Sequence, residues 1–131
     1  MDSQIKHAIQ TTLNQIPAIK LAIVFGSVVD NRETASSDID LAVLTDTHMD
    51  AIQKSQIIAA LASATGRAID LIDLRTAGQP LLGQIITRGA RIMGDDADYA
   101  QLISKNLFEQ ADFLPYRNRI LDERREAWIG K

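Results

Sequence analysis

The stretch "VFGSVVDNRETASSDIDLAVL", residues 24–44, decides the fold. It begins inside an apolar segment, turns polar after Gly26 and Ser27, and becomes apolar again in a segment that carries Asp38 and Asp40. This alternation predicts two strands joined by a loop. The loop has about 12 residues, a length that is uncommon between neighbouring strands and is often functional. We therefore expect the functional site to lie where the loop meets the two strands.

The rest of the chain extends this pattern in both directions. Helices are predicted over residues 3–16, 50–64 and 80–88 and from residue 96 onwards, and strands over residues 18–26, 39–45, 67–74 and 90–94. An apolar stripe with helical spacing marks the last helix: Tyr99, Ile103, Leu107, Ala111 and Leu114. Pro115 should kink or end that helix. This order of elements predicts an α/β (α+β) fold, a small mixed β-sheet flanked by helices, with C-terminal helices.

Composition excludes several classes of function. The chain has 131 residues, enough for one domain with a core, and no cysteine, which excludes disulfides, thiolate zinc sites and cysteine nucleophiles. The net charge is -3, so the chain has no excess of positive charge that would attract nucleic acid, and no direct nucleic-acid binding is expected. No apolar run approaches the ~20 residues of a membrane span. The N-terminal residues lack the pattern of a signal peptide, so we expect a cytoplasmic protein with no membrane partner.

Asp38 and Asp40 point to a cation. Side chains alternate along a strand, so these two carboxylates should share one face. At ~4 Å their repulsion costs about 1 kcal/mol in water and about 4 kcal/mol at an effective dielectric constant of 20. Solvent, a proton or a metal ion must offset that cost. Because Mg²⁺ binds one or two carboxylates together with waters and substrate phosphates, the pair is a candidate magnesium site.

Gly26 and Ser27 supply groups that bind phosphate. A glycine at the end of a strand lets backbone N–H groups approach a phosphate closely, and the Ser27 hydroxyl can donate to a phosphate oxygen. A third acid, Asp70, lies in the predicted strand 67–74 and is suited to metal ligation or to general-base work on an acceptor hydroxyl. Asp73 is the competing candidate. It should face away from Asp70 and is better suited to capping the end of the strand.

The joint pattern Gly-Ser, ten residues, Asp-x-Asp resembles the signature of the polymerase-beta-type nucleotidyltransferase superfamily. The short chain is similar to the minimal nucleotidyltransferase (MNT) branch, which includes the antitoxins of the HEPN–MNT modules. The segments "GRAIDLIDL" and "ITRGARIMGDD" also resemble that branch. The resemblance implies a nucleotidyltransferase fold over one domain, residues 1–131, with a core of about 19–95 and a C-terminal helical extension of about 96–131.

The resemblance also implies roles for residues of this sequence. Gly26 and Ser27 would hold the nucleotide phosphates, Asp38 and Asp40 would ligate Mg²⁺, and Asp70 matches the third acid, a metal ligand or base. One departure concerns the Ala-Arg-Gly-like segment that many members carry soon after the serine. This chain has Val28 to Asn31 there, and the nearest arginine is Arg32. Arg32 either takes over a phosphate contact or is a solvated loop charge.

The choice of acceptor follows from what the chain lacks. It has neither the basic channel of a polymerase nor the second domain that closes over a small substrate, so its site should be open to an acceptor on another protein. The resemblance implies an antitoxin that transfers AMP from ATP to a tyrosine hydroxyl of a partner HEPN toxin, with Mg²⁺ as cofactor. Two alternatives remain: an antitoxin that only binds and occludes its toxin, and a free-standing small-molecule nucleotidyltransferase.

Overall fold

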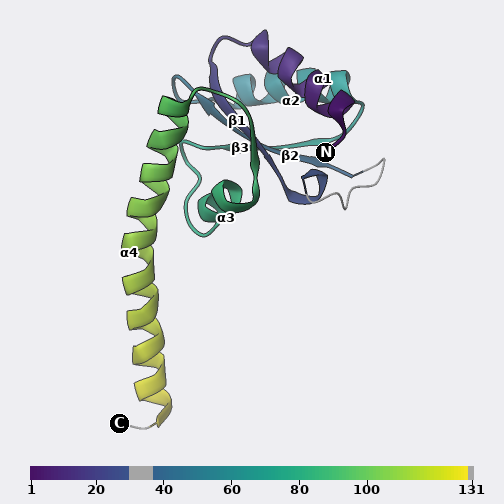
Figure 1. Ribbon diagram of the computed structural model, residues 1–131. Helices are drawn as coiled ribbons and strands as arrows, with labels where there is room; N and C mark the ends of the chain where they lie inside the picture. The colour runs from purple at the N-terminus through teal and green to yellow at the C-terminus, as the bar shows by residue number, and fades with distance from the viewer. Residues whose placement is uncertain (30–36, 130–131) are drawn as a thin grey trace.

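The order of helices and strands is the one that the sequence predicts. The computed structural model describes the backbone of residues 1–29 and 37–129 and the side chains of residues 1–29 and 37–112. Along the chain the elements are α1 (Ser3–Asn14), β1 (Ile19–Phe25), a short 3₁₀ turn η1 (Gly26–Val28), β2 (Ile39–Thr45), α2 (Ala51–Thr65), β3 (Ile69–Asp73), α3 (Leu81–Arg88), β4 (Ala90–Met93) and α4 (Asp96–Ile129). Figure 1 shows these elements along the chain.

The four strands form one mixed sheet in the order β3-β2-β1-β4. β1 pairs antiparallel with both β2 and β4, whereas β2 and β3 are parallel and are connected through α2. This confirms the expected small mixed sheet flanked by helices. The topology places β2, which carries Asp40, between β1 and β3, so that the end of β1 and the beginning of β3 both lie beside it.

Short polar residues and one glycine fix the ends of the first two long helices. The Asp2 side chain accepts a hydrogen bond from the Gln4 backbone N–H at 2.8 Å, and the Asp50 side chain accepts one from the Gln53 N–H at 2.7 Å. Each satisfies an N–H group that the helix cannot pair internally. Gly66 ends α2 in the left-handed conformation, with φ 69°, as expected for a glycine at this position.

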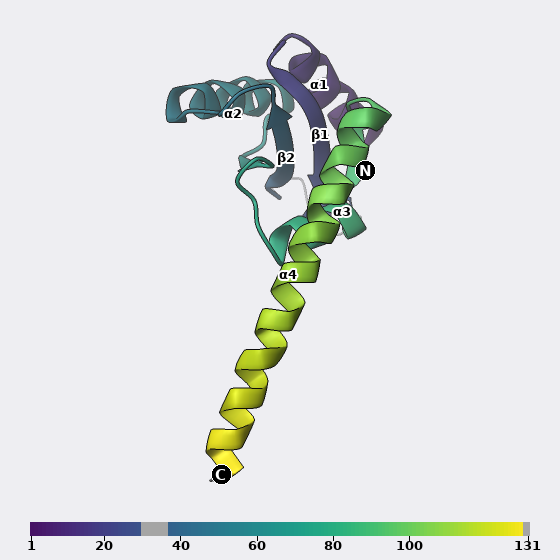
Figure 2. The same cartoon turned by 90° about the vertical axis from the view of Figure 1, so that its left-hand side faces the viewer.

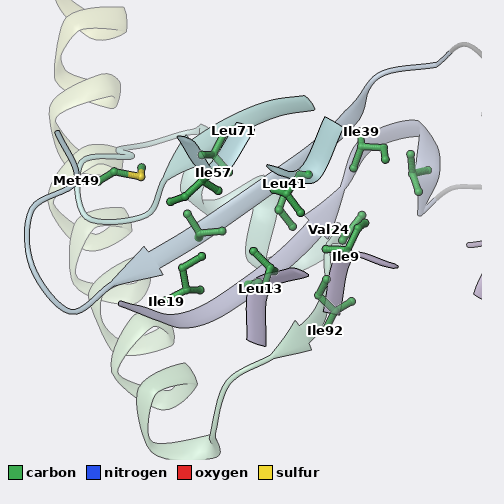
Figure 3. Packing of buried hydrophobic residues seen from close by; sticks show 14 residues of the cluster. Ile9, Leu13, Ile19, Val24, Ile39, Leu41, Met49, Ile57, Leu71 and Ile92 are labelled. Carbon is green, nitrogen blue, oxygen red and sulfur yellow. The ribbon is translucent and has the colours of Figure 1, made fainter. Parts of the chain in front are cut away.

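The two faces of the sheet have different neighbours. On one face α1 and α2 cover a large apolar cluster that includes Ile39, Leu41 and Val43 of β2 (Figure 3). The other face carries a smaller cluster, in which Ala42 of β2 packs with residues of β1, α3 and the beginning of α4, among them Leu21, Ile23, Leu82, Ile85 and Leu102. Because side chains alternate along β2, Asp40 lies on this second face, with Ala42.

α4 packs on the domain through its first turns and then runs away from it (Figures 1 and 2). Among the α4 side chains up to residue 112, Leu102 and Asn106 are buried. The Gln79 side-chain amide donates to the Asn106 side-chain oxygen at 2.7 Å and ties α4 to the turn before α3. The sequence predicts that Pro115 kinks or ends this helix. It does not end it, since α4 continues to Ile129. In the part of the chain that the structure describes, no helix combines the length and the apolar character needed to cross a membrane.

Candidate active site

Gly26, directly after β1, has a backbone conformation that favours glycine. Its φ is 77°, and a Cβ atom built on it would overlap Oδ2 of Asp40. The chain turns at once into η1, where the Val29 backbone N–H donates to the Gly26 carbonyl at 3.2 Å, and Ser27 lies half-buried in this turn. Glycine is therefore required at position 26 for two reasons, the positive φ and the contact with the carboxylate of Asp40.

The strand register brings Asp40 and Asp70 together. Asp40 is the register partner of Phe25 in β1 and of Asp70 in β3. Register partners on adjacent strands project to the same face, so the end of β1 and the two carboxylates form one row across three strands. When one of the two carboxyl groups carries a proton, the Asp40 and Asp70 side chains can share a hydrogen bond. Asp38 stands just before β2 and is exposed to solvent.

The pKa of the Asp40 carboxyl group is raised above its ordinary value of 3.8. Burial is the largest cause, since it removes water from the charged form. The negative charge of Asp70, the hydrogen bond with Asp70 and the charge of Asp38 raise it further. The site thus disfavours a full set of ionised carboxylates unless a positive charge lies close by.

Arg67 holds the strand entry that carries Asp38, a role that the sequence interpretation missed. Its guanidinium Nε donates to the Ser37 carbonyl at 2.9 Å, and the Ile39 backbone N–H donates to the Ala68 carbonyl at 2.9 Å. These two hydrogen bonds connect the residues around Asp38 to the beginning of β3. The only signal in the sequence is an arginine at the start of "RAIDLIDL", which does not reveal a carbonyl 30 residues away.

Of the two remaining candidate residues, the structure describes Asp73 and does not describe Arg32. Asp73 pairs in register with Val43, three positions beyond Asp70, and its Oδ1 accepts a hydrogen bond from the Arg75 backbone N–H at 2.9 Å. It caps the turn after β3, as expected, and lies on the opposite face of the strand from Asp70. Arg32 lies outside the residues that the structure describes.

The donor set fits a divalent cation that keeps open coordination positions. Among residues 1–29 and 37–112, no group of three or more histidine, aspartate or glutamate side chains is placed so that it could hold a metal ion. Mg²⁺ does not need such a group, because it binds through one or two carboxylates and takes its other ligands from water and phosphate. Asp40 lies next to one carboxylate and near another, and their charges raise its pKa. A cation there would remove that repulsion, which is the reason to regard these residues as suited to magnesium.

A separate pocket lies at the other end of the same sheet face. Its volume is about 300 Å³ and its lining comes from the far ends of β1 and β2, the turn after β3 and the first turns of α4: Lys20, Leu44, Leu74, Arg75, Asp98, Gln101, Leu102 and Lys105. Leu44 is four residues from Asp40 along β2, which places this pocket about 13 Å from the acid row. It contains none of the predicted site residues, so the acid row is the candidate active site.

The geometry agrees with what comparison to known proteins shows. The family described as "Polymerase beta, Nucleotidyltransferase" matches residues 7–98 of this chain. The chain belongs to this nucleotidyltransferase family. It is 32% identical over 110 residues to the protein adenylyltransferase MntA of Shewanella oneidensis, a match that covers 84% of this chain and 79% of MntA.

Solved structures of toxin–antitoxin complexes share the fold. A crystal structure of a toxin–antitoxin pair with AMP-PNP superposes with a TM-score of 0.80 at 30% identity, covering 92% of this chain and 98% of that one. A structure of the tri-AMPylated HEPN toxin of Shewanella oneidensis in complex with its MNT antitoxin gives a TM-score of 0.77 at 29% identity, with coverage of 95% and 99%. These matches confirm the nucleotidyltransferase fold that the sequence predicts.

Proposed function

We propose that this chain is an antitoxin that transfers AMP from ATP to a tyrosine hydroxyl of a partner HEPN toxin and thereby neutralises the toxin. One observation carries the proposal: Gly26 lies against the carboxylate of Asp40, and Asp70 stands beside Asp40 in register. This arrangement occurs in a chain that is 32% identical to a protein adenylyltransferase.

The chemistry assigns a part to each group. The tyrosine oxygen attacks the α-phosphorus of ATP, a new P–O bond forms, the bond to the bridging oxygen breaks, and pyrophosphate leaves. The turn at Gly26 and Ser27 binds the phosphates through backbone N–H groups and the serine hydroxyl. A phenol has a pKa of about 10 and is a poor nucleophile at neutral pH, so a base must accept its proton. Asp70 is our candidate base because it is exposed and lies next to Asp40.

Magnesium is the cofactor that we assign to Asp38 and Asp40, with Asp70 as a further ligand or as the base. When bound, Mg²⁺ neutralises charge on the transferred phosphoryl group. The raised pKa of Asp40 supports this assignment, because a carboxyl group that is costly to ionise alone gains most from a neighbouring cation.

Arg32 remains a proposed nucleotide contact. The cytoplasm is the proposed compartment, since the reaction consumes ATP.

The test is intact-mass spectrometry of the HEPN toxin after co-expression with this chain. We expect one or more additions of about 329 Da, the mass that adenylyl transfer to a hydroxyl adds. The matched control is the double variant Asp38→Asn/Asp40→Asn, which keeps side-chain size and removes both charges, and which should leave the toxin unmodified. If the toxin is neutralised by the wild type without any added mass, the chain acts by occlusion and the transferase proposal is wrong.

Asp70→Asn separates the base from the binding surface. We expect AMP transfer to fall at pH 7 and to recover partly at higher pH, where more of the phenol is ionised without help. Binding of the toxin by this variant should equal that of the wild type. A transfer rate that falls equally at every pH would assign Asp70 to metal ligation instead of proton transfer.

A further inference from the structure

α4 exposes part of its apolar surface to solvent in the structure described here. Leu102 is 4% exposed and Asn106 is 5% exposed, and they face the domain. Leu107 is 60% exposed and Phe108 is 74% exposed. Leu107 belongs to the apolar stripe that the sequence marks and Phe108 lies next to it, so α4 presents apolar side chains to solvent beyond the part of the stripe, at Tyr99, that packs on the domain.

The anchoring of α4 keeps this stripe away from the domain. The Gln79 amide donates to the buried Asn106 side chain, and the Lys105 ammonium donates to the carbonyls of Leu74 and Arg75, each at 3.1 Å. These bonds fix the rotation of the helix about its own axis. The helix therefore cannot turn Leu107 and Phe108 inward without breaking three hydrogen bonds between α4 and the segment that connects β3 to α3.

The length of α4 also indicates that another protein surface packs against it. Its 34 residues correspond to about 51 Å of helix, and its second half projects from the domain in both views (Figures 1 and 2). Helices draw most of their stability from packing of an apolar face, and isolated ones are marginal in water. Contiguous exposed apolar residues on a protein of this size mark an interaction surface more often than a chance feature.

We propose that the apolar face of α4 formed by Ile103, Leu107, Phe108 and Ala111, here called the α4 stripe, is the surface that docks the HEPN toxin. This proposal rests on the proposed function and adds to it the place where the protein acceptor binds. The α4 stripe lies on the helix whose first turns pack on the sheet face that also carries Asp40. The pocket that the first turns of α4 help to line lies about 13 Å from the acid row along this face.

The solved relatives favour the toxin over a second copy of this chain as the occupant. A toxin–antitoxin complex matches 92% of this chain and 98% of its own counterpart, and the tri-AMPylated HEPN complex matches 95% and 99%. The unmatched 8% of this chain amounts to about ten residues, so most of the 34 residues of α4 lie inside the match. A helix of this kind is thus present in chains that were solved together with a toxin.

The experiment measures toxin binding and AMP transfer on the same variants. Leu107→Asp and Phe108→Asp each place a charge on the α4 stripe without touching the domain core. Ile52→Asp is the matched control, since Ile52 is 71% exposed and belongs to α2, on the opposite face of the sheet. Affinity for the HEPN toxin is measured by isothermal titration in the Asp38→Asn/Asp40→Asn background, so that modification does not alter the toxin during the titration. Circular dichroism and thermal melting report on folding.

We expect each stripe variant to bind the toxin at least about tenfold more weakly, as for a central apolar contact of an interface, while Ile52→Asp binds like its parent. An equal loss of toxin affinity in Ile52→Asp, or no loss of affinity in the stripe variants, would contradict the proposed docking surface. A stripe variant that dissociates a dimer of this chain but still binds toxin assigns the stripe to a second copy and also overturns it.

The two proposals fail in different ways. Toxin binding that depends on the α4 stripe, with no added AMP in the active chain, sustains the docking surface and refutes the transferase function. Added AMP at the wild-type rate in Leu107→Asp sustains the function and refutes the surface. A chain that neither binds nor modifies an HEPN toxin refutes both.

Discussion

The two faces of β2 differ in what they contribute to the protein. Ile39, Leu41 and Val43 are fully buried under α1 and α2, in the larger apolar cluster. On the other face Asp40 is only half-buried, and Ala42 and Leu44 follow it toward α3 and α4. One strand of seven residues therefore supports a core on one side and carries a charged row at the end of the other.

This difference shows how the fold tolerates a costly site. The carboxylates repel one another, and Gly26 forgoes a side chain so that Asp40 can occupy its place. None of these features stabilises the protein. The register of β1, β2 and β3 nevertheless holds the acid row in position, because the same backbone is fixed by apolar packing on its opposite face. Substitutions on the two faces should therefore separate activity from stability.

The largest effect should come from the double variant Asp38→Ala/Asp40→Ala. It removes the carboxylates that we assign to Mg²⁺, and losing a cation next to the transferred phosphoryl group should lower the rate of AMP transfer about a thousandfold or more, equivalent to about 4 kcal/mol. The melting temperature should not fall, since no core contact is lost. Single-turnover rates and thermal melting measure the two quantities. Transfer at the wild-type rate would show that the metal assignment is wrong.

Leu41→Ala tests the opposite face of the same strand. Leu41 is 0% exposed, and truncating a buried leucine to alanine costs about 2–5 kcal/mol in the free energy of unfolding. Chemical denaturation should show this loss, while the transfer rate per folded molecule stays close to that of the wild type at low temperature. Ile52→Ala, at an exposed position, is the control and should change stability by less than about 0.5 kcal/mol. A large rate loss in folded Leu41→Ala would mean that the faces are coupled.

Much of this contrast could be predicted from the sequence. Strand alternation places Asp40 and Leu41 on opposite faces, and the capping residues and glycines place the helix ends within a few residues of where they lie. Asp70 and Asp73 are distinguished by the same alternation. The division into a core of about 19–95 and an extension of about 96–131 stays a prediction.

Other features depend on contacts between segments far apart in the chain. The register that sets Asp70 beside Asp40, and the hydrogen bond from Arg67 to the Ser37 carbonyl, require knowledge of which strands pair and where. The buried side of α4 is also set by tertiary polar contacts to Asn106 and Lys105, which leave Leu107 in solvent. Periodicity alone identifies a helix here but not the side that faces the domain.

Ser27→Ala should have a smaller effect than loss of the two aspartates. A hydrogen bond from the serine hydroxyl to a charged phosphate oxygen is worth about 1.5–3 kcal/mol, which corresponds to roughly a 10- to 150-fold lower rate. The backbone N–H groups of η1 remain in place and still bind phosphate. Single-turnover rates measured beside those of Asp38→Ala give the order. If Ser27→Ala were the slower of the two, Ser27 would be required to shape the turn as well as to contact phosphate.

The smallest effect concerns stability and pH at Asp40. Because its pKa is raised in the folded chain above 3.8, the folded state holds that proton more tightly than the unfolded state does, and the free energy of unfolding falls as pH rises through the interval between the two values. Asp40→Asn removes the charge, so this variant should be more stable than the wild type at pH 7, and the difference should shrink toward pH 4. Urea denaturation of both proteins at pH 4, 5.5 and 7 without added metal measures the gap. Added Mg²⁺ should then stabilise the wild type at pH 7 and leave Asp40→Asn nearly unchanged, because only the ionised carboxylate attracts the cation. An Asp40→Asn variant that is less stable than the wild type at pH 7 would show that the carboxylate makes contacts in the fold that outweigh its repulsion from Asp70 and Asp38.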